Sequence, residues 1–554
     1  MTHSQLGEGA LWRPVSRRSV LRGGTGLAGV FMLGSTGALL EACSNASNSS
    51  SGSPAKKTLT YGAWQAPDTL DPATTGLAAT SRIITQVFDT LLYQLAGETK
   101  LLPGLATSWE VSPDAKLYTL KLRTGVKFHD GTPFDAKAVQ FTFDRIVNPQ
   151  TKALSALGAL GPYSHSTVVD DHTIQIAFDS PYAPFLNVLS QVILAPVSPT
   201  AVQKYGQDFG SHPVGTGPFM VKDYAQRDHV TLVRNPDYNW APAFYGQNGP
   251  AALESIKWRI IPEDATRMGT LQTGEADVIE YLVPQSVAQF KSNSKYKVQL
   301  IDAPGSPRVI MINVTKPPTD DLAVRQAMLY AVDQKTIVNV LFKDVYKPAS
   351  SPLEPPTLGY DASIANMYTA DPTKAAQLLD GAGWKMGSGG IRQKNGVALK
   401  PLFINIANDQ FDQIAQIVQA DLRKVGIDLQ LQNESEPTVF STYNQGPQNF
   451  SEIFYWFNDP SLLYSLYHSS QIAHGFNWGH YSNPQVDELL VRGGATPDPA
   501  QRVTIYQQAQ QQIMKDAVIM PIQSKRTVMA LNASIDGMRF TSITYPLLYA
   551  TKWK

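Results

Sequence analysis

The chain contains 554 residues, which is enough for roughly two to four domain-sized hydrophobic cores. Its 46 basic side chains balance 46 acidic ones, so no basic excess exists to neutralise phosphates. The composition therefore argues against a nucleic-acid partner. Cys43 is the only cysteine, which excludes an internal disulfide and a multi-cysteine metal cluster.

The first 43 residues have the features of an export signal. Arg17 and Arg18 precede an uncharged run at 23–40 that is short for a membrane span and fits the apolar core of a signal peptide. The paired arginines resemble a twin-arginine signal, with the general secretion route as the alternative. The sequence L-E-A-C at 40–43 resembles a lipoprotein cleavage box.

These features make Cys43 the expected lipidation site. A diacylglyceryl group on Cys43 would supply two acyl chains, which is enough for stable membrane anchoring. The alternative is a buried structural cysteine after an ordinary signal helix. Residues 44–56 are rich in Ser, Asn, Gly, Ala and Pro, and such a composition predicts a flexible tether between the membrane and a folded body.

From residue 57 the sequence predicts alternating strands and helices. Residues 117–122 alternate polar and apolar side chains as a strand does, and Asp135 is placed to cap a following helix. Residues 81–92 space their apolar side chains as one face of a helix. Residues 168–178 have the character of a single strand.

The second half predicts further capped helices and a parallel pair of strands. Asp333, Asp371 and Asp498 each stand at the start of a predicted helix, and proline follows the last two. A strand, a helix and another strand follow within residues 403–431, which is a βαβ unit with parallel pairing.

The known catalytic and nucleotide-binding motifs are missing from the sequence. Gly215 and Gly217 suggest a phosphate loop, but Met220 stands where the third glycine belongs, so we expect a turn into a strand. No G-x-S-x-G, H-E-x-x-H, Walker or EF-hand motif is present. The regular spacing of His468, His474 and His480 suits neither a helix face nor a tight loop pair, so no metal site is expected.

Several short motifs of the sequence resemble those of a known protein family. Residues 106–145 contain W-E, L-R-x-G-V-K-F-H-D-G-T-P-F and A-x-x-V-x-F-T-F, and G-T-G-P-F, G-E-A-D-V, V-R-Q-A and A-G-W follow later in the chain. Together they resemble the bacterial extracellular solute-binding proteins of family 5, which include the oligopeptide- and dipeptide-binding proteins of ABC importers.

The resemblance implies an α/β, two-lobed periplasmic-binding-protein-like fold (type II, cluster C) with a subdomain inserted in the first lobe. We expect lobe I to comprise 57–97, 209–302 and 528–554, the insertion to span 98–208, and lobe II to span 303–527. The implied protein is a monomeric, lipid-anchored solute-binding protein outside the cytoplasm, on the outer face of the plasma membrane or in the periplasm. It is not an enzyme and uses no cofactor.

The resemblance also implies a mechanism. The two lobes would close on a short peptide and deliver it to a membrane permease powered by a separate ATPase. Another solute, such as an oligosaccharide or a nickel or other metal chelate, is the alternative. An extracellular enzyme or a purely structural surface protein is a third possibility, against which the missing catalytic motifs speak.

The resemblance points to candidate ligand-binding residues in the second half. In peptide-binding relatives an aspartate after a tryptophan meets the peptide's ammonium group. Asp459 follows Trp456 but directly precedes Pro460, so it is either this amine anchor or only a structural turn. Trp456 is the expected pocket wall, with core packing as its alternative.

Three further candidates complete the predicted site. Arg308, expected just before the first strand of the second lobe, is the candidate partner for a ligand carboxylate, since a guanidinium binds one bidentately. Its alternative is a solvated hinge arginine. Trp64 and Gln65 follow the first strand, where family members line the cleft, and the competing view for Trp64 is core packing.

Overall fold

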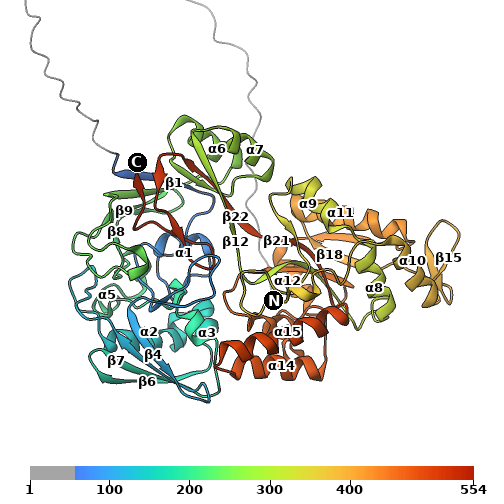
Figure 1. Cartoon of the computed structure of the whole chain (residues 1–554), viewed down its shortest axis with the longest axis horizontal. Helices are drawn as coiled ribbons and strands as arrows, with labels where there is room; N and C mark the ends of the chain where they lie inside the picture. Colours follow the sequence, from blue (N-terminus) through green and yellow to red (C-terminus); the bar gives the residue numbers. More distant parts are fainter. Residues whose placement is uncertain (1–55) are drawn as a thin grey trace, which may run out of the picture. The chain divides into compact units, whose positions relative to one another are not determined.

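The computed structural model describes residues 56–554 (Figure 1). The predicted signal peptide, Cys43 and the predicted tether up to residue 55 lie outside the described residues. The described part mixes helices and strands, and its two largest sheets have seven and six strands. We call the part built on the seven-stranded sheet the first lobe and the part built on the six-stranded sheet the second lobe.

The first-lobe sheet has mixed pairing. Its central strand β1 pairs in parallel with both neighbours, whereas the other pairs are antiparallel. In spatial order, the strands are β12 (Tyr296–Asp302), β22 (Arg526–Asn532), β11 (Val278–Glu280), β1 (Thr58–Ala63), β10 (Ser255–Ile260), β9 (His229–Arg234) and β8 (Phe219–Ala225).

The second-lobe sheet contains the βαβ unit expected from the sequence. Strands β18 and β19 pair in parallel, and the long helix α11 (Asp409–Lys424) connects them. In spatial order, the strands are β14 (Lys347–Pro348), β21 (Ile519–Ser524), β13 (Ser306–Ile312), β20 (Phe450–Tyr455), β18 (Leu402–Ile406) and β19 (Gln430–Glu434).

Two strands carry the chain from one sheet to the other. β12 and β22 are neighbours in the first sheet, and their continuations β13 and β21 are neighbours in the second. The crossing segments are residues 303–305 on the outward path and Lys525 on the return. β22 begins at Arg526, near the start of the last predicted segment of lobe I at residue 528, and the predicted lobe boundaries stay predictions.

A third sheet belongs to the segment that was predicted to be inserted. It has four antiparallel strands, and the single strand expected at 168–178 is in fact two strands that form a hairpin. Its core is continuous with that of the first lobe, so the insertion does not fold around a core of its own. In spatial order, its strands are β4 (Ala106–Val111), β5 (Leu117–Leu122), β7 (Thr173–Phe178) and β6 (Tyr163–Asp170).

The remaining strands form small sheets at the edges of the lobes. They are β2 (Leu92–Tyr93) with β3 (Leu102–Pro103), β15 (Lys385–Met386) with β16 (Arg392–Lys394) and β17 (Val397–Ala398), β23 (Ile535–Asp536) with β26 (Lys552–Trp553), and β24 (Arg539–Phe540) with β25 (Pro546–Leu547).

The α-helices cover the sheets, and several begin at the predicted caps. Asp135, Asp333, Asp371 and Asp498 each accept a backbone N–H of the following helix, as predicted. The first predicted helix is shorter than its pattern suggested and ends at Ile84. The helices not yet given are α1 (Ala78–Ile84), α2 (Ala136–Val147), α3 (Leu154–Leu160), α4 (Phe185–Val188), α5 (Pro199–Tyr205), α6 (Asp264–Thr273), α7 (Val287–Ser292), α8 (Leu322–Ala331), α9 (Gln334–Phe342), α10 (Pro372–Gly381), α12 (Glu436–Tyr443), α13 (Leu462–Tyr467), α14 (Pro484–Ala495) and α15 (Pro499–Lys515).

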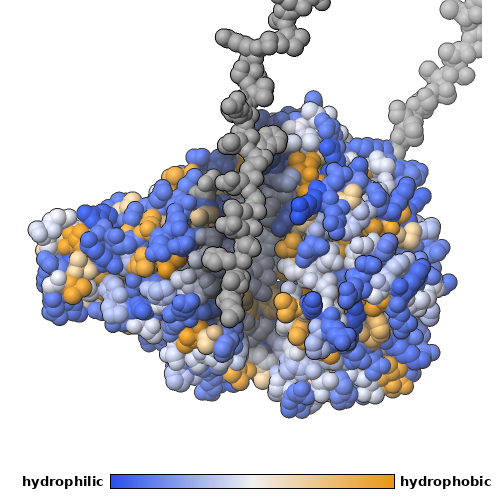
Figure 2. Space-filling model, turned by 180° about the vertical axis from the view of Figure 1, so that it is seen from behind, coloured by the Kyte–Doolittle hydropathy of each residue, from blue (hydrophilic) through white to orange (hydrophobic). Residues whose placement is uncertain are grey.

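Each lobe has its own hydrophobic core. The larger cluster runs through the first lobe and the insertion, and a second cluster fills the second lobe. Phe457 packs against both clusters and so lies where the lobes meet. The face drawn in Figure 2 is mostly hydrophilic with scattered apolar residues, as expected of a protein surface in water.

Candidate functional site

On the first-lobe side a buried arginine lies between two tyrosine rings. Arg82 of α1 is 1% exposed, and its guanidinium lies 5.1 Å from the ring of Tyr281 and 5.4 Å from that of Tyr545. Its Nη2 donates to the Tyr281 hydroxyl at 2.8 Å, and its Nε lies 3.5 Å from the carboxylate of Glu280. The rings and the carboxylate hold the cation in one place.

Glu280 ends β11 and organises this side of the site. Its carboxylate also accepts from the Tyr61 hydroxyl at 3.2 Å and from the backbone N–H of Trp64 at 3.1 Å. The next residue, Tyr281, has φ +53, a backbone conformation that costs a bulky residue free energy and occurs often at functional sites.

Arg82 keeps one donor free. Its Nη1 is buried and has no hydrogen-bond partner among the side chains and backbone that the structure describes. An unpaired buried donor on a cation is costly. A bound acceptor that satisfies this donor would therefore gain free energy.

A second buried arginine lies on the second-lobe side. Arg308 is the third residue of β13 rather than a residue before the strand, and it is buried rather than solvated, so both of these expectations are wrong. Its guanidinium pairs with Glu452 of β20 and lies 4.0 Å from the ring of Phe411. Its Nε is buried and has no partner in the described part of the chain.

Lys525, which links β21 to β22, adds another positive group next to Arg308. Its ammonium lies 3.3 Å from the centre of the Phe454 ring. Poor solvation lowers the pKa of Lys525 well below its usual value, and the neighbouring Arg308 lowers this pKa further. Lys525 forms no ion pair with any side chain that the structure describes.

The two groups of residues face each other where the lobes meet. Burial raises the pKa of Tyr545, and the nearby Tyr455, at the end of β20, raises it further. Likewise Tyr346 of the second lobe lies close to both Tyr281 and Arg308, with burial as the main cause of its raised pKa. We call the following set the interlobe site: Trp64, Arg82, Glu280, Tyr281 and Tyr545 from the first lobe, and Arg308, Glu452, Phe454, Tyr455 and Lys525 from the second.

Asp459 lies apart from these residues in a network that ties the second lobe to the insertion. It is 0% exposed, and its two oxygens accept from the Arg502 guanidinium at 2.7 and 2.9 Å. Asn187 of α4 and the backbone N–H of Ser461 donate to the same carboxylate at 2.5 and 2.9 Å. Burial acts to raise the pKa of Asp459, but Arg502 outweighs it, so this pKa lies below its usual value.

The other predicted site residues are placed as follows. Trp64 directly follows β1, is 37% exposed and lies 5.2 Å from Tyr281, so it is not core packing. Gln65 is half-buried beside it. Trp456 is half-buried, and its indole N–H is buried without a partner among the described residues. The roles of all five residues in ligand binding stay predictions.

Sequence reasoning missed the strongest features of the first-lobe side. Arg82 was hidden inside an apolar helical pattern, although an arginine next to that stripe was the available signal. Glu280 follows the G-E-A-D-V motif by two residues, and a carboxylate at the end of a buried strand was a similar signal. Tyr545 lies far along the chain, and nothing local distinguished it from a surface tyrosine.

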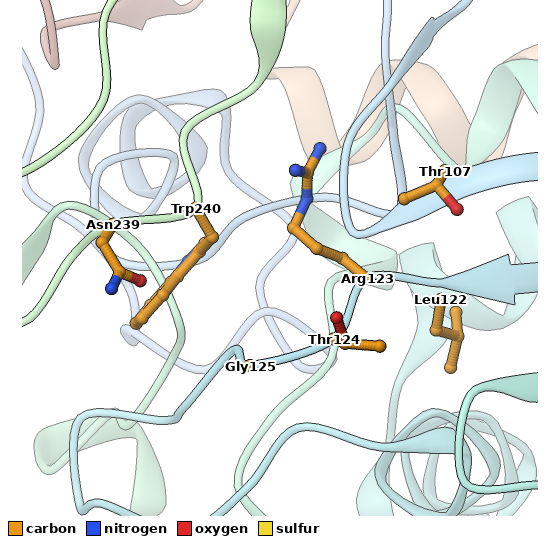
Figure 3. Close-up of a pocket in the computed structure, with 7 residues that line it drawn as sticks. All are labelled: Thr107, Leu122, Arg123, Thr124, Gly125, Asn239 and Trp240. Carbon is orange, nitrogen blue, oxygen red and sulfur yellow. The ribbon is translucent and has the colours of Figure 1, made fainter.

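A separate hollow of about 570 Å³ lies outside the interlobe site (Figure 3). It is lined only by residues of the first lobe and the insertion, which are Thr107, Leu122, Arg123, Thr124, Gly125, Asn239 and Trp240. Trp240 is held in place because its indole N–H donates to Asp89 at 3.1 Å. The hollow contains none of the predicted site residues.

Two features are absent from the part of the chain that the structure describes. Within residues 56–554, no cluster of His, Cys, Asp and Glu side chains is placed to hold a metal ion. None of the helices in this range is both long enough and apolar enough to span a membrane.

The chain forms two α/β lobes that two short segments join, and the arginine donors without a partner among the described residues lie where the lobes meet. This arrangement is that of a two-lobed solute-binding protein. Residues 100–474 match the model of the bacterial extracellular solute-binding proteins, family 5 (middle region). The chain is 30% identical over 522 residues to the glutathione-binding protein GsiB of Shigella flexneri, an alignment that covers 92% of this chain and 95% of that protein. The chain therefore belongs to family 5 of the bacterial extracellular solute-binding proteins.

Solved structures agree with this assignment. HbpA2 from Haemophilus parasuis is 25% identical, with a TM-score of 0.78 over 90% of this chain and 100% of that one. NikA from Brucella suis, in complex with Fe(III)-EDTA, is 27% identical, with a TM-score of 0.77 over the same shares. DppA from Helicobacter pylori, in complex with the peptide STSA, is 25% identical, with a TM-score of 0.71 over 90% and 98%.

The family assignment confirms the predicted fold class and the predicted role as a solute-binding protein of an ABC transporter. The family consists of extracytoplasmic proteins that bind solutes for transport and are not enzymes. The prediction that this chain is not an enzyme is confirmed in the same way.

Proposed function

We propose that the protein captures short peptides between its two lobes and delivers them to an ABC permease driven by a separate ATPase. The observation that carries the proposal is the pair of buried arginines, one from each lobe, each with a donor that has no partner within residues 56–554. A peptide offers carboxylate and carbonyl oxygens, which are the acceptors that such donors need. The relative GsiB is named for glutathione, which is a short peptide.

Closure of the lobes would follow from contacts to both faces. A ligand held by Arg82 and by the second-lobe residues is bound more tightly in the closed form than in the open one. This difference in affinity shifts the population toward the closed form. The closed form would be the state that the permease recognises.

A metal chelate is the second candidate solute. NikA, which shares the fold, holds Fe(III)-EDTA, and the carboxylates of a chelate would suit the same arginines. The peptide stays the first proposal because the relative with 30% identity is named for a peptide.

Binding assays would separate these candidates. We expect di- to pentapeptides or glutathione to raise the melting temperature of the purified protein by mass action, and cello-oligosaccharides and Fe(III)-EDTA to leave it unchanged. A shift with Fe(III)-EDTA alone would replace the peptide by a chelate. Turnover of any of these compounds would contradict a purely binding role.

The predicted lipid anchor completes the proposal. Cys43 would carry the lipid and residues 44–56 would form the tether. The protein would act as a monomer on the outer face of the plasma membrane or in the periplasm. Replacing Cys43 by serine should move the exported protein from the membrane fraction to the soluble fraction. Retention of that variant in the membrane fraction would argue for another anchor.

A further inference from the structure

The interlobe site contains three basic side chains and two carboxylates. Arg82 is matched by Glu280 and Arg308 by Glu452, whereas Lys525 forms no ion pair with any described side chain. The carboxyl of Glu354 accepts the backbone N–H of Lys525 at 2.8 Å. Burial raises the pKa of Glu354 to about 8 and lowers that of Lys525 well below its usual value, so the donors of the two arginines, rather than the Lys525 ammonium, are what the site offers to a negatively charged ligand.

In each of the two arginines, the group that lacks a hydrogen-bond partner among the described residues is an N–H donor. Arg82 Nη1 and Arg308 Nε are both buried, and neither has a partner among the described residues. Both oxygens of Glu280 already accept hydrogen bonds, from Tyr61 and from the backbone of Trp64. A ligand that offers only acceptors and brings negative charge fits this pattern better than one that brings an additional cation.

Arg82 is the better placed of the two arginines to distinguish ligands. The rings of Tyr281 and Tyr545 and the hydrogen bond to the Tyr281 hydroxyl fix the plane of its guanidinium. A fixed guanidinium binds a carboxylate with little loss of side-chain entropy. Arg308 is instead covered by the Phe411 ring and committed to Glu452.

We propose that the interlobe site selects short peptides of net negative charge and that Arg82 binds the carboxylate that supplies this charge. The inference rests on the proposed peptide-binding function and adds the substrate class. It assigns to Arg82 a role as a specificity-determining residue, whereas Tyr281 and Tyr545 position it.

The test compares three dipeptides by isothermal titration calorimetry on the purified protein. Ala-Glu and Ala-Gln have nearly the same shape and differ by one negative charge, and Ala-Lys carries a positive charge instead. We expect Ala-Glu to bind at least about tenfold more tightly than Ala-Gln, and Ala-Lys to bind most weakly.

The informative variant combines Arg82→Met with Glu280→Gln, so that no buried carboxylate loses its partner. The side-chain carbonyl of the glutamine at position 280 can still accept from the backbone N–H of Trp64, and its NH2 group can donate to the Tyr61 hydroxyl, which now donates to Glu280. The ratio of the Ala-Glu and Ala-Gln affinities should fall to about one, mainly through weaker binding of Ala-Glu. Arg82→Lys keeps the charge but loses the planar fork, and it should give an intermediate ratio.

The matched control combines Arg259→Met with Glu275→Gln, which removes a solvent-exposed arginine–glutamate pair of the same lobe. It should keep the wild-type ratio. Failure of all three dipeptides to bind the wild type would overturn both the peptide function and this inference. Equal binding of all three would leave the function in place and overturn the charge selection. A preference for Ala-Glu that survives the Arg82 variant would overturn the role of Arg82.

Discussion

At the scale of single residues, buried charges are paired for structural reasons at one place and left open for a ligand at another. Asp459 uses both oxygens on Arg502, Asn187 and Ser461. Arg82, which is equally buried, has a donor to spare among the described residues. Both residues are charged, so only their partners in space separate the two roles.

The first prediction concerns Asp459→Ala. Removing this carboxylate leaves Arg502 as an uncompensated buried charge, and breaking such a pair costs about 3–5 kcal/mol of the free energy of unfolding. Urea denaturation would measure the loss. As a control, Glu488→Ala breaks an exposed pair with Arg492 and should cost at most about 1 kcal/mol. A stable Asp459→Ala protein that has lost peptide binding would instead identify Asp459 as the amine anchor.

The second prediction concerns acid stability and His129. This side chain is half-buried, its Nε2 lies 2.9 Å from the Gly217 carbonyl oxygen, and the loss of solvation lowers its pKa to about 4. Between about pH 6.5 and 4 the unfolded chain therefore binds a proton that the folded protein does not, so stability falls as the pH falls. His129→Gln should flatten this part of the stability profile, as followed by urea midpoints at several pH values. The same replacement at the exposed His165 should leave the slope unchanged.

At the scale of elements, two close backbone contacts explain the glycines of a family motif that has no chemical role. A Cβ on Gly215 would lie 2.2 Å from the carbonyl oxygen of Val87, and one on Gly217 would lie 2.6 Å from the carbonyl carbon of Val87. The G-T-G-P-F turn thus needs glycine because the chain passes directly against the end of the first helical segment. This agrees with the prediction of a turn into a strand, since β8 begins at Phe219.

The third prediction follows from that contact. Gly217→Ala should destabilise the protein because backbone atoms, which cannot rotate away, occupy the space for the methyl group. Gly269 in α6 has open space around its Cβ position, so Gly269→Ala should stabilise by up to about 1 kcal/mol through helix propensity. Thermal unfolding of both variants would test the opposite signs. Equal effects would show that the contact with Val87 is not limiting.

The two crossing segments are held by one loop of the second lobe. The backbone N–H of Glu354 donates to the Gly305 carbonyl oxygen at 2.8 Å, and its carboxylate accepts from the backbone N–H of Lys525 at 2.8 Å. Thr357 accepts from the backbone N–H of Gly305 at 2.8 Å. The loop therefore fixes where each strand leaves the second lobe, and we expect bending to take place on the first-lobe side of these contacts.

The fourth prediction concerns Glu354→Gln. Burial raises the pKa of Glu354 to about 8, above the usual value of an unfolded chain, about 4.3. Its favourable contribution is complete below about pH 4.3 and is lost as the pH rises toward 8. Glutamine keeps the acceptor for Lys525 but does not titrate, so the variant should lose less stability between pH 5 and 8 than the wild type. An unchanged slope in urea titrations would contradict a neutral carboxyl at this position.

At the scale of the whole molecule, the lobes meet partly through polar side chains, beside the apolar contact of Phe457 with both cores. Asn458 donates to Gln94 and Ser190 at 3.0 and 2.9 Å and accepts from Gln191 at 2.9 Å. Such groups find partners in water when the lobes part, so opening costs less than exposing a hydrophobic interface would. A small difference in ligand affinity is then enough to shift the balance between open and closed forms.

The fifth prediction is that a tightly bound peptide lowers the radius of gyration. Small-angle X-ray scattering with and without saturating ligand would measure the change. As a control, the radius of gyration of the double variant Arg82→Met with Glu280→Gln is measured with saturating Ala-Gln, a peptide without net charge. Curves that superimpose with and without a saturating peptide would contradict closure of the two lobes.

The sequence by itself determined the family, the α/β class, the helix caps and the parallel βαβ unit. Caps and turns depend on neighbours a few residues away, and a match to family motifs indicates a whole fold at once. The lobe boundaries and ligand roles stay predictions, because no local pattern tests them.

Only the tertiary structure decided which charged side chains share a partner. Arg82 meets Glu280 and Tyr545, and Arg308 meets Glu452, through contacts between segments more than a hundred residues apart in the chain. Pairing determines whether a buried charge is neutralised or left open to a ligand, and this depends on distances in space. For that reason the sequence identified Asp459, whose charge is already satisfied, and overlooked Arg82, which has a donor without a partner in the described part of the chain.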